Sequence, residues 1–432
     1  MECPGQPRSW GLAIGLPNAL VALALPILLA VATGLVQPAQ AQTFSVIHNF
    51  SGGQDGAAPM AGLTVDQGGN LYGSAARGGN VGACGGIGCG IVFRLAKGNS
   101  GWVLTPLYSF AGGKDGTSPQ ANVVFAADGS LTSTTYWGGG TCDQNPDGCG
   151  TIFKLQPPAS ACKTSLCPWT ETVLHQFNGS DGAGPVGTVI FDPTGNLYGA
   201  ATAGGFRNGG TVFELAPSGS ARVIYSPYGY PGGGVIRDST GNIYGTAFSG
   251  GNGQGSVYEL TPAGAGWIGI NLYDFANGSD AGYPWAGLIF DQAGNLYGST
   301  TAGGSGNGGT VFRMTASNGN WIFDTLYSFT GPGDSRFVVG PLGSLVMDSA
   351  GSLYGTTFAD GAHGLGAVFK LTPSNDSWTF TSLHDFTGGS DGAYPYSNLV
   401  FDASGNLYGT ASQGGTSANC SGGCGVVFEI KP

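Results

Sequence analysis

Charged side chains are scarce in this chain of 432 residues, where Asp, Glu, Lys and Arg together make up 9%. Lys and Arg number 14 against 25 acidic residues, which gives a formal net charge of −11. Nucleic-acid binding requires clustered Lys and Arg, so we expect no nucleic-acid partner. The acidic surplus is better explained as a solubility feature.

Helical patterning and long apolar runs are also absent beyond residue 41. No segment there repeats its apolar residues every 3.6 positions, so we expect almost no helix. Glycine is abundant, with 83 residues, yet it follows no Gly-x-y period. Since 41% of the residues are apolar and fall in short alternating runs, we predict an all-β fold with a packed core.

One long apolar stretch, from about Gly11 to Leu35, lies near the start of the chain. Pro17 and Pro26 interrupt it, and Ala39-Gln40-Ala41 then supplies the small residues that a signal peptidase recognises. We predict a signal peptide over residues 1–41, cleaved after Ala41, and a single secreted or periplasmic domain over residues 42–432. The alternative is an uncleaved stretch that anchors the chain. After cleavage we expect no membrane association.

Eight cysteines follow residue 41, in four close pairs: Cys84/Cys89, Cys142/Cys149, Cys162/Cys167 and Cys420/Cys424. An even number of cysteines in an exported chain indicates disulfides. Zinc is the alternative, but the spacings differ and no histidine lies within a few residues of any pair. We therefore predict four local disulfides, three of which restrain long glycine-rich loops.

One short phrase recurs along the chain. Its fullest form is Asp291-Gln292-Ala293-Gly294-Asn295-Leu296-Tyr297 followed by Gly298, and successive copies lie 46 to 66 residues apart. The seven copies centre on Gly69, Gly129, Gly195, Gly241, Gly294, Gly351 and Gly405. A repeat of this length with strand-like content predicts a β-propeller.

Each copy has the chemistry of a tight β-hairpin. A side chain such as that of Asp291 accepts hydrogen bonds from backbone N–H groups two residues on, and Gly294 supplies a positive φ. Apolar residues stand on both sides of the turn, as hairpin strands require. We interpret the second glycine, Gly298 in this copy, as a point where one blade lies close to the next.

Residues 287–329 illustrate the repeating unit. Strand a is Gly287–Phe290, strand b is Leu296–Thr301, strand c is Thr310–Met314 and strand d is Trp321–Phe329. Strand d opens with Trp in five copies (Trp102, Trp169, Trp267, Trp321 and Trp378). We interpret these aromatic residues as packing between blades rather than as ligand contacts.

The two ends of the chain supply complementary parts of one unit. The last copy stops after strand c, at Lys431-Pro432, whereas Thr43–Phe50 resembles an isolated strand d. An unpaired edge strand invites aggregation, and pairing the first strand with the last three removes that edge. We therefore predict a seven-bladed β-propeller of four-stranded blades whose ring is closed by Thr43–Phe50.

The order Gly-Asn-Leu-Tyr-Gly-Thr/Ser, Gly-Gly, Gly-Thr-Val-Phe-x-Leu resembles the secreted bacterial tandem repeats called GloVer, of the choice-of-anchor type, over roughly residues 43–430. More distantly, Asp-x-x-Gly-Asn-x-Tyr is similar to NHL-type propeller repeats. The resemblance implies export and a repeat scaffold, and it implies no reaction or catalytic residue. The family's name also implies a surface anchor after the repeats, which this sequence does not show, so we do not expect wall attachment.

No nucleophile elbow, His-Glu-x-x-His motif or Cys–His pair is present. Three of the four histidines, His48, His175 and His384, occupy a strand-d position that is Tyr in other copies, so we assign them to packing.

The loops from strand d to the next strand a share the pattern Gly-x-Asp-Gly-x-x-Pro, at Asp55, Asp115, Asp181, Asp391 and, more loosely, Asp280. We expect these loops to share one rim with the b–c loops. The carboxylates are weak candidates for calcium. Because each loop offers one carboxylate, we favour turn caps, and we expect no cofactor unless calcium binds here.

The repeat is broken at three places on the same rim. Tyr225–Pro231 replaces one Asp loop, Asp334–Phe337 enlarges another, and Asp360–His363 stands in a glycine loop. Asp334, Arg336, Asp360 and His363 are weak catalytic candidates, because together they offer acids, a cation and an imidazole. Independent drift of loop sequences explains them more simply.

Three functional hypotheses remain. The one that we favour is a monomeric, non-catalytic module that binds an extracellular glycan or protein through rim aromatic residues: Tyr228, Tyr230, Trp285, Tyr394 and Tyr396. The second is an extracytoplasmic enzyme acting on polysaccharide, and glycosidases need two carboxylates at a defined separation. The third is a purely structural exported scaffold.

Overall fold

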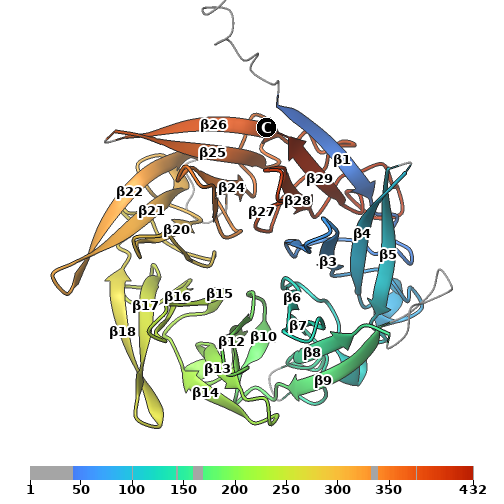
Figure 1. Ribbon diagram of the computed structural model, residues 1–432, viewed down its shortest axis with the longest axis horizontal. Helices are drawn as coiled ribbons and strands as arrows, with labels where there is room; N and C mark the ends of the chain where they lie inside the picture. The colour runs from blue at the N-terminus through green and yellow to red at the C-terminus, as the bar shows by residue number, and fades with distance from the viewer. Residues whose placement is uncertain are drawn as a thin grey trace, which may run out of the picture. The chain divides into compact units, whose positions relative to one another are not determined.

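The computed structural model describes residues 42–99, 101–142, 145–158, 169–331, 339–375 and 377–431. These residues form seven antiparallel sheets within Gln42–Lys431. Figure 1 shows the sheets in chain order around a ring, from blue through green and yellow to red. The predicted all-β, seven-bladed propeller is therefore confirmed.

Each blade runs from strand a near the centre to strand d at the outside. Blade 1 contains β2 (Thr64–Val65), β3 (Leu71–Ala75), β4 (Ile91–Gly98) and β5 (Gly101–Ser109). Blade 2 contains β6 (Val124–Phe125), β7 (Leu131–Thr135), β8 (Thr151–Gln156) and β9 (Thr170–Gln176). Blade 3 contains β10 (Ala183–Pro185), β11 (Ile190–Phe191), β12 (Leu197–Ala203), β13 (Thr211–Leu215) and β14 (Ala221–Tyr225). In that blade strand a is split, and both β10 and β11 pair with β12.

The remaining blades follow the same order. Blade 4 contains β15 (Pro231–Arg237), β16 (Ile243–Ala247), β17 (Ser256–Ala263) and β18 (Gly266–Asp274). Blade 5 contains β19 (Ile289–Phe290), β20 (Leu296–Thr300), β21 (Asn307–Ser317) and β22 (Asn320–Thr330). Blade 6 contains β23 (Val346–Met347), β24 (Leu353–Thr357), β25 (Ala367–Ser374) and β26 (Ser377–Asp385). Blade 7 contains β27 (Val400–Phe401), β28 (Leu407–Ala411), β29 (Val426–Lys431) and, as its outer strand, β1 (Thr43–Asn49).

Helical structure is confined, in the described ranges, to three short 3₁₀ turns: η1 (Cys84–Gly86), η2 (Gly113–Asp115) and η3 (Phe206–Asn208). None of the helices described is long and apolar enough to span a membrane. The predicted signal peptide, residues 1–41, lies outside the described residues.

The ring closes as predicted. β1 pairs antiparallel with β29, from Thr43 opposite Lys431 to Asn49 opposite Val426, with a bulge between Val46 and His48. In Figure 1 the blue β1 lies along the dark red β29. The pairing gives β29 a partner on both sides, so no strand-c edge is left open in blade 7.

The Asp of the repeated phrase organises its hairpin. Oδ1 of Asp291 accepts hydrogen bonds from the N–H groups of Ala293 and Asn295, both at 2.9 Å. Its Oδ2 accepts from Nδ2 of Asn295 at 2.7 Å and from the Tyr297 hydroxyl at 3.1 Å. The sequence predicts the backbone bonds. The side-chain bonds explain in addition why Asn and Tyr recur in the phrase.

The glycine after that Tyr makes room inside its own blade, so its interpretation as a contact between blades is wrong. A Cβ atom on Gly298 would lie 2.5 Å from Cζ of Phe312, on β21 of the same sheet. The same relation joins Gly409 and Phe428, again at 2.5 Å. The glycine on strand b thus leaves space for the ring of the strand-c Phe in the same blade.

Aromatic rings join neighbouring blades, as the sequence predicts. The Phe that ends strand d packs against the strand-c Phe of the next blade, with ring centroids 5.1 to 5.6 Å apart: Phe50–Phe93, Phe110–Phe153, Phe177–Phe213, Phe275–Phe312, Phe329–Phe369 and Phe386–Phe428. The Trp that opens strand d packs against the hairpin Tyr of the preceding blade: Trp102–Tyr408, Trp267–Tyr198, Trp321–Tyr244 and Trp378–Tyr297.

The junction of blades 3 and 4 departs from this pattern. Tyr258 takes the strand-c position of Phe, and its ring lies 5.5 Å from Tyr225. Tyr258 is 0% exposed, and its hydroxyl has no hydrogen-bond partner within the described chain. A buried polar group without a partner is destabilising.

We therefore expect Tyr258→Phe to raise the free energy of unfolding by about 1 kcal/mol, because it removes the unpartnered hydroxyl and keeps the ring. Tyr244→Phe is the matched control, since that hydroxyl bonds to Glu259 Oε1 at 2.9 Å, and this variant should be less stable than wild type. Chemical denaturation of the wild type and the two variants measures both changes in the free energy of unfolding. A loss of stability in Tyr258→Phe contradicts the interpretation.

A second departure lies between blades 1 and 2. In three blades one position of strand d holds a Phe whose ring stacks on the neighbouring blade: Phe44, Phe323 and Phe380. In blade 2 the same position holds Glu171. Oε1 of Glu171 and Oδ1 of Asp115 are both buried and have no hydrogen-bond partner within the described chain. Burial, together with the charge of Asp115, raises the pKa of Glu171 to about 7.

This shift predicts a pH dependence of stability. The folded-state pKa of about 7 lies above the ordinary value of 4.5, so the folded chain holds the proton longer than the unfolded chain. The stability contributed by this group is present below about pH 4.5 and is lost as pH rises through about 7. Glu171→Gln should flatten that part of the profile and be more stable than wild type at about pH 8.

Melting temperatures of both proteins across this pH range test the expectation. The two proteins differ only at residue 171, so the difference between the two profiles reports on Glu171. Parallel profiles would contradict the assignment.

Candidate functional site

Two sets of loops meet at one end of the propeller. Isolated β-bridges join the d–a loop before a blade to the residues just after strand b of that blade: Ala57 with Arg77, Thr117 with Trp137, Gly282 with Ala302 and Ala393 with Gln413. The d–a and b–c loops therefore lie side by side, as the sequence predicts. We call this end the loop rim. The short a–b and c–d turns lie at the opposite end.

The centre of the propeller is almost closed. A Pro-x-x-x-Leu/Val segment opens strand a in each blade, and residues from all seven segments surround a cavity of about 50 Å³. The backbones approach closely there, since a Cβ atom on Gly233 would lie 1.8 Å from N of Gly287. This volume holds roughly one or two water molecules. This central cavity is therefore too small for a ligand of sugar size.

The loop Asp residues hold their own loops. Asp391 Oδ2 accepts the N–H of Thr387 at 2.9 Å and lies 3.1 Å from Nε2 of His384. Burial tends to raise the pKa of Asp391, but the bonds from Thr387 and His384 outweigh it and lower that pKa below its ordinary value. The arrangement is that of a turn cap anchored to strand d.

The other loops repeat this cap with either His or Tyr as the anchor. Asp55 lies 3.3 Å from His48 and Asp181 lies 2.8 Å from His175, whereas Asp115 accepts from the Tyr108 hydroxyl at 3.1 Å and Asp280 from the Tyr273 hydroxyl at 2.9 Å. The exchange of His and Tyr at this position is thus explained by a shared contact with the loop carboxylate. Within the described chain, no three His, Cys, Asp or Glu side chains come together as metal ligands.

The structure describes two of the four residues that the sequence suggests as catalytic, Asp360 and His363. Asp334 and Arg336 lie outside the described residues. Asp360 is half-buried, and burial with a contribution from Asp385 raises its pKa. His363 is exposed, and among the described contacts none joins it to Asp360. The catalytic role of this group stays a prediction.

Three of the predicted aromatic residues lie at the inner edge of the rim and are partly buried. The Trp285 ring packs against Phe248 at 5.4 Å, and Tyr394 and Tyr396 pack against Phe358 at 5.1 and 6.1 Å. Burial, helped by nearby Tyr136, raises the pKa of Tyr396 to about 12. Packing occupies much of the surface of these three side chains.

The other two predicted aromatic residues are exposed, Tyr228 by 63% and Tyr230 by 44%. Next to them stands Phe206, 66% exposed, in the b–c loop of blade 3. The guanidinium of Arg207 lies 5.2 Å from the Phe206 ring and 5.7 Å from the Tyr228 ring, and its Nη1 donates to the Tyr228 hydroxyl. We call Phe206, Arg207, Tyr228 and Tyr230 the aromatic patch.

Sequence reasoning missed Phe206 and Arg207. The signal was present, because these large side chains stand between Gly204-Gly205 and Gly209-Gly210, where other b–c loops carry mostly small residues. Arg207 also has a φ of +55°, which is uncommon outside glycine. The predicted loop break at Tyr225–Pro231 and this b–c loop belong to one feature.

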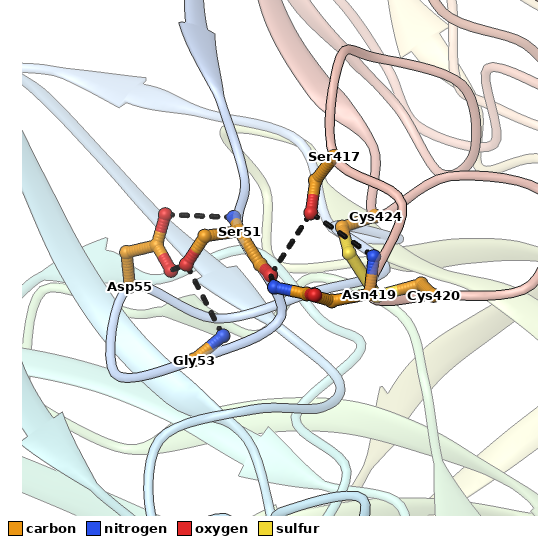
Figure 2. Close-up of a disulfide and its surroundings, with 7 residues drawn as sticks. All are labelled: Ser51, Gly53, Asp55, Ser417, Asn419, Cys420 and Cys424. Atoms are coloured by element: carbon orange, nitrogen blue, oxygen red, sulfur yellow. Dashed lines mark hydrogen bonds between the residues drawn. A yellow bond between two sulfur atoms is a disulfide. The ribbon is translucent and has the colours of Figure 1, made fainter.

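Three of the four predicted disulfides are present: Cys84–Cys89, Cys142–Cys149 and Cys420–Cys424. They lie in the b–c loops of blades 1, 2 and 7, which are consecutive around the ring. The fourth pair, Cys162 and Cys167, lies outside the described residues. Figure 2 shows Ser417 and Asn419, beside the blade 7 disulfide, both donating to the Ser51 carbonyl, at 3.1 and 2.9 Å.

Comparison with solved structures finds propellers of low similarity. A protein of unknown function from Dyadobacter fermentans is 12% identical, with a TM-score of 0.48, and the match covers 90% of this chain and 98% of that one. A candidate glucose dehydrogenase from Thermus thermophilus is 13% identical, with a TM-score of 0.45 and coverages of 90% and 100%. A candidate gluconolactonase is 12% identical, with a TM-score of 0.43 and coverages of 91% and 92%. Similarity at this level does not bear on function.

No curated protein matches the sequence. The family model described as the Gloeobacter/Verrucomicrobia repeat matches twice in succession, over residues 87–228 and 225–428. These matches span most of the propeller, including six of the seven hairpin phrases. The chain therefore belongs to the Gloeobacter/Verrucomicrobia repeat family.

Proposed function

We propose that this protein is an exported, monomeric, non-catalytic module that binds a glycan on the aromatic patch of its loop rim. One observation carries the proposal. Four aromatic side chains of the described chain are at least 36% exposed, and three of them, Phe206, Tyr228 and Tyr230, gather in this patch. Exposed aromatic residues grouped on a rigid scaffold are typical of a binding surface.

The chemistry of the patch suits a sugar. An aromatic face presents apolar surface to the C–H face of a sugar ring, and Tyr adds a hydroxyl at its edge. Arg207 contributes N–H donors beside both rings, which suit the hydroxyl oxygens of a carbohydrate. Because Arg207 already contacts Phe206 and Tyr228, little ordering is needed when a ligand binds.

A further observation supports the proposal. The three disulfides favour export, since disulfides persist in oxidising compartments.

We expect Phe206→Ala and Tyr228→Ala each to weaken glycan binding at least about tenfold, because each removes roughly 1.4 kcal/mol or more of apolar contact. A glycan array identifies the ligand, and affinity electrophoresis in that polysaccharide measures the loss. Phe125→Ala is the control, since this exposed Phe lies on the a–b hairpin of blade 2, at the opposite end of the propeller.

Equal retention of wild type and both patch variants would contradict the proposed site. Hydrolysis of a polysaccharide by the wild type, lost in His363→Ala, would replace binding by catalysis. Retention lost equally in Phe125→Ala would indicate a general effect on folding.

A further inference from the structure

A groove crosses the loop rim over blades 7, 1 and 2. It consists of two adjoining cavities of about 690 and 620 Å³, each within the size range of small-molecule sites. Both cavities are lined by Ala76, Arg77, Ile87, Ser118 and Trp137, so they form one continuous surface. We call it the seam groove, because it lies beside the closure of the ring. The aromatic patch belongs to other blades.

Disulfides stiffen its walls. Cys84 lines one cavity and Cys420 lines the other. Gly52 packs directly on the blade 7 disulfide, where an added Cβ atom would lie 2.9 Å from Sγ of Cys420. Figure 2 shows how Asn419 fastens this loop to the segment that follows β1, through its bond to the Ser51 carbonyl. The groove is therefore formed before any ligand binds.

The lining combines flat apolar surface with amides. The Trp137 ring is partly exposed and is held edge-on by Tyr136, with centroids 4.2 Å apart. Ile87 is 55% exposed beside it. Gln120, from the segment that opens blade 2, and Gln413 and Asn419, from blade 7, add donors and acceptors to the lining. An indole face flanked by amides fits a sugar ring and its hydroxyl groups.

The lining of the groove contains one cation, Arg77, and one carboxylate, Asp147. Arg77 is exposed, and no carboxylate pairs with it within the described chain. The lining near blade 7 contains no acidic residue, and Asp147 lies toward blade 2. A guanidinium recognises a carboxylate through two parallel hydrogen bonds. The net charge of −11 repels a polyanion, which favours a ligand with one carboxylate over a highly charged polymer.

We propose that the seam groove binds an oligosaccharide of neutral sugars that carries one uronic acid, with Trp137 stacked on a sugar ring and Arg77 paired with the carboxylate. This site goes beyond the glycan site proposed for the aromatic patch. It shares no residue with that patch, so an experiment can contradict one of the two proposed sites without contradicting the other.

Isothermal titration of the purified protein with two defined probes tests the proposal. The acidic probe is glucuronic acid linked to xylotriose, and the neutral probe is xylotetraose. We expect the wild type to bind the acidic probe at least about tenfold more tightly, and Arg77→Gln to abolish that preference while leaving xylotetraose binding unchanged. Arg77 is exposed, so this variant should melt at the wild-type temperature.

Trp137→Ala should weaken both probes, and Trp137→Phe, which keeps an aromatic face, should restore most of the binding. Phe125→Ala, on the a–b hairpin of blade 2 and outside both proposed sites, should change neither affinity. Three results would overturn the proposal: no binding of either probe, equal affinities of wild type and Arg77→Gln for the acidic probe, or binding that is lost in Tyr228→Ala instead.

Discussion

The pairing of β1 with β29 is the constraint on which the rest of this structure depends. It joins residues nearly four hundred positions apart, from Thr43 with Lys431 to Asn49 with Val426. Without it, blade 7 would expose the backbone of β29, and an open strand edge is prone to pair with other chains. The same pairing places Ser51 where Ser417 and Asn419 bond to its carbonyl, so it also positions one wall of the seam groove.

Between the blades, the repeated aromatic residues carry the packing. At six of the seven junctions the Phe that ends strand d packs on the strand-c Phe of the next blade, which repeats the same geometry around the ring. Where the pattern changes, a polar group is left buried without a partner, as at Tyr258 and Glu171. Because the repeated residues form the hairpins and the packing between blades, we propose that ligand recognition falls to positions that vary between repeats: Tyr228, Phe206, Arg77 and Trp137.

Local chemistry made much of the fold predictable. Asp291 bonds to residues two and four positions on, so its role is visible in a short stretch of sequence. Ring closure was also predictable, because the missing strand at one end matched the extra strand at the other. The contact between Gly298 and the Phe312 ring was not predictable, because Phe312 comes from a strand whose register is set by the whole sheet.

The candidate sites were less accessible to sequence reasoning. Tyr228 and Tyr230 stood out because their loop breaks the repeat, whereas Phe206 and Arg207 reach the same place from a different loop. Arg77 and Trp137 come from different blades and meet only through the curvature of the ring. The loop carboxylates were expected to be caps, but their bonds to strand-d His and Tyr depend on side-chain direction, which spacing alone does not give.

Hydrogen–deuterium exchange of the β1 amides tests the closure of the ring most directly. If β1 is the outer strand of blade 7, the amides of residues 43–49 that bond to β29 should exchange as slowly as those of β29 itself, through opening of the blade. Exchange of β1 at the rate of an unpaired segment, with β29 also exposed along one edge, would contradict the closed ring.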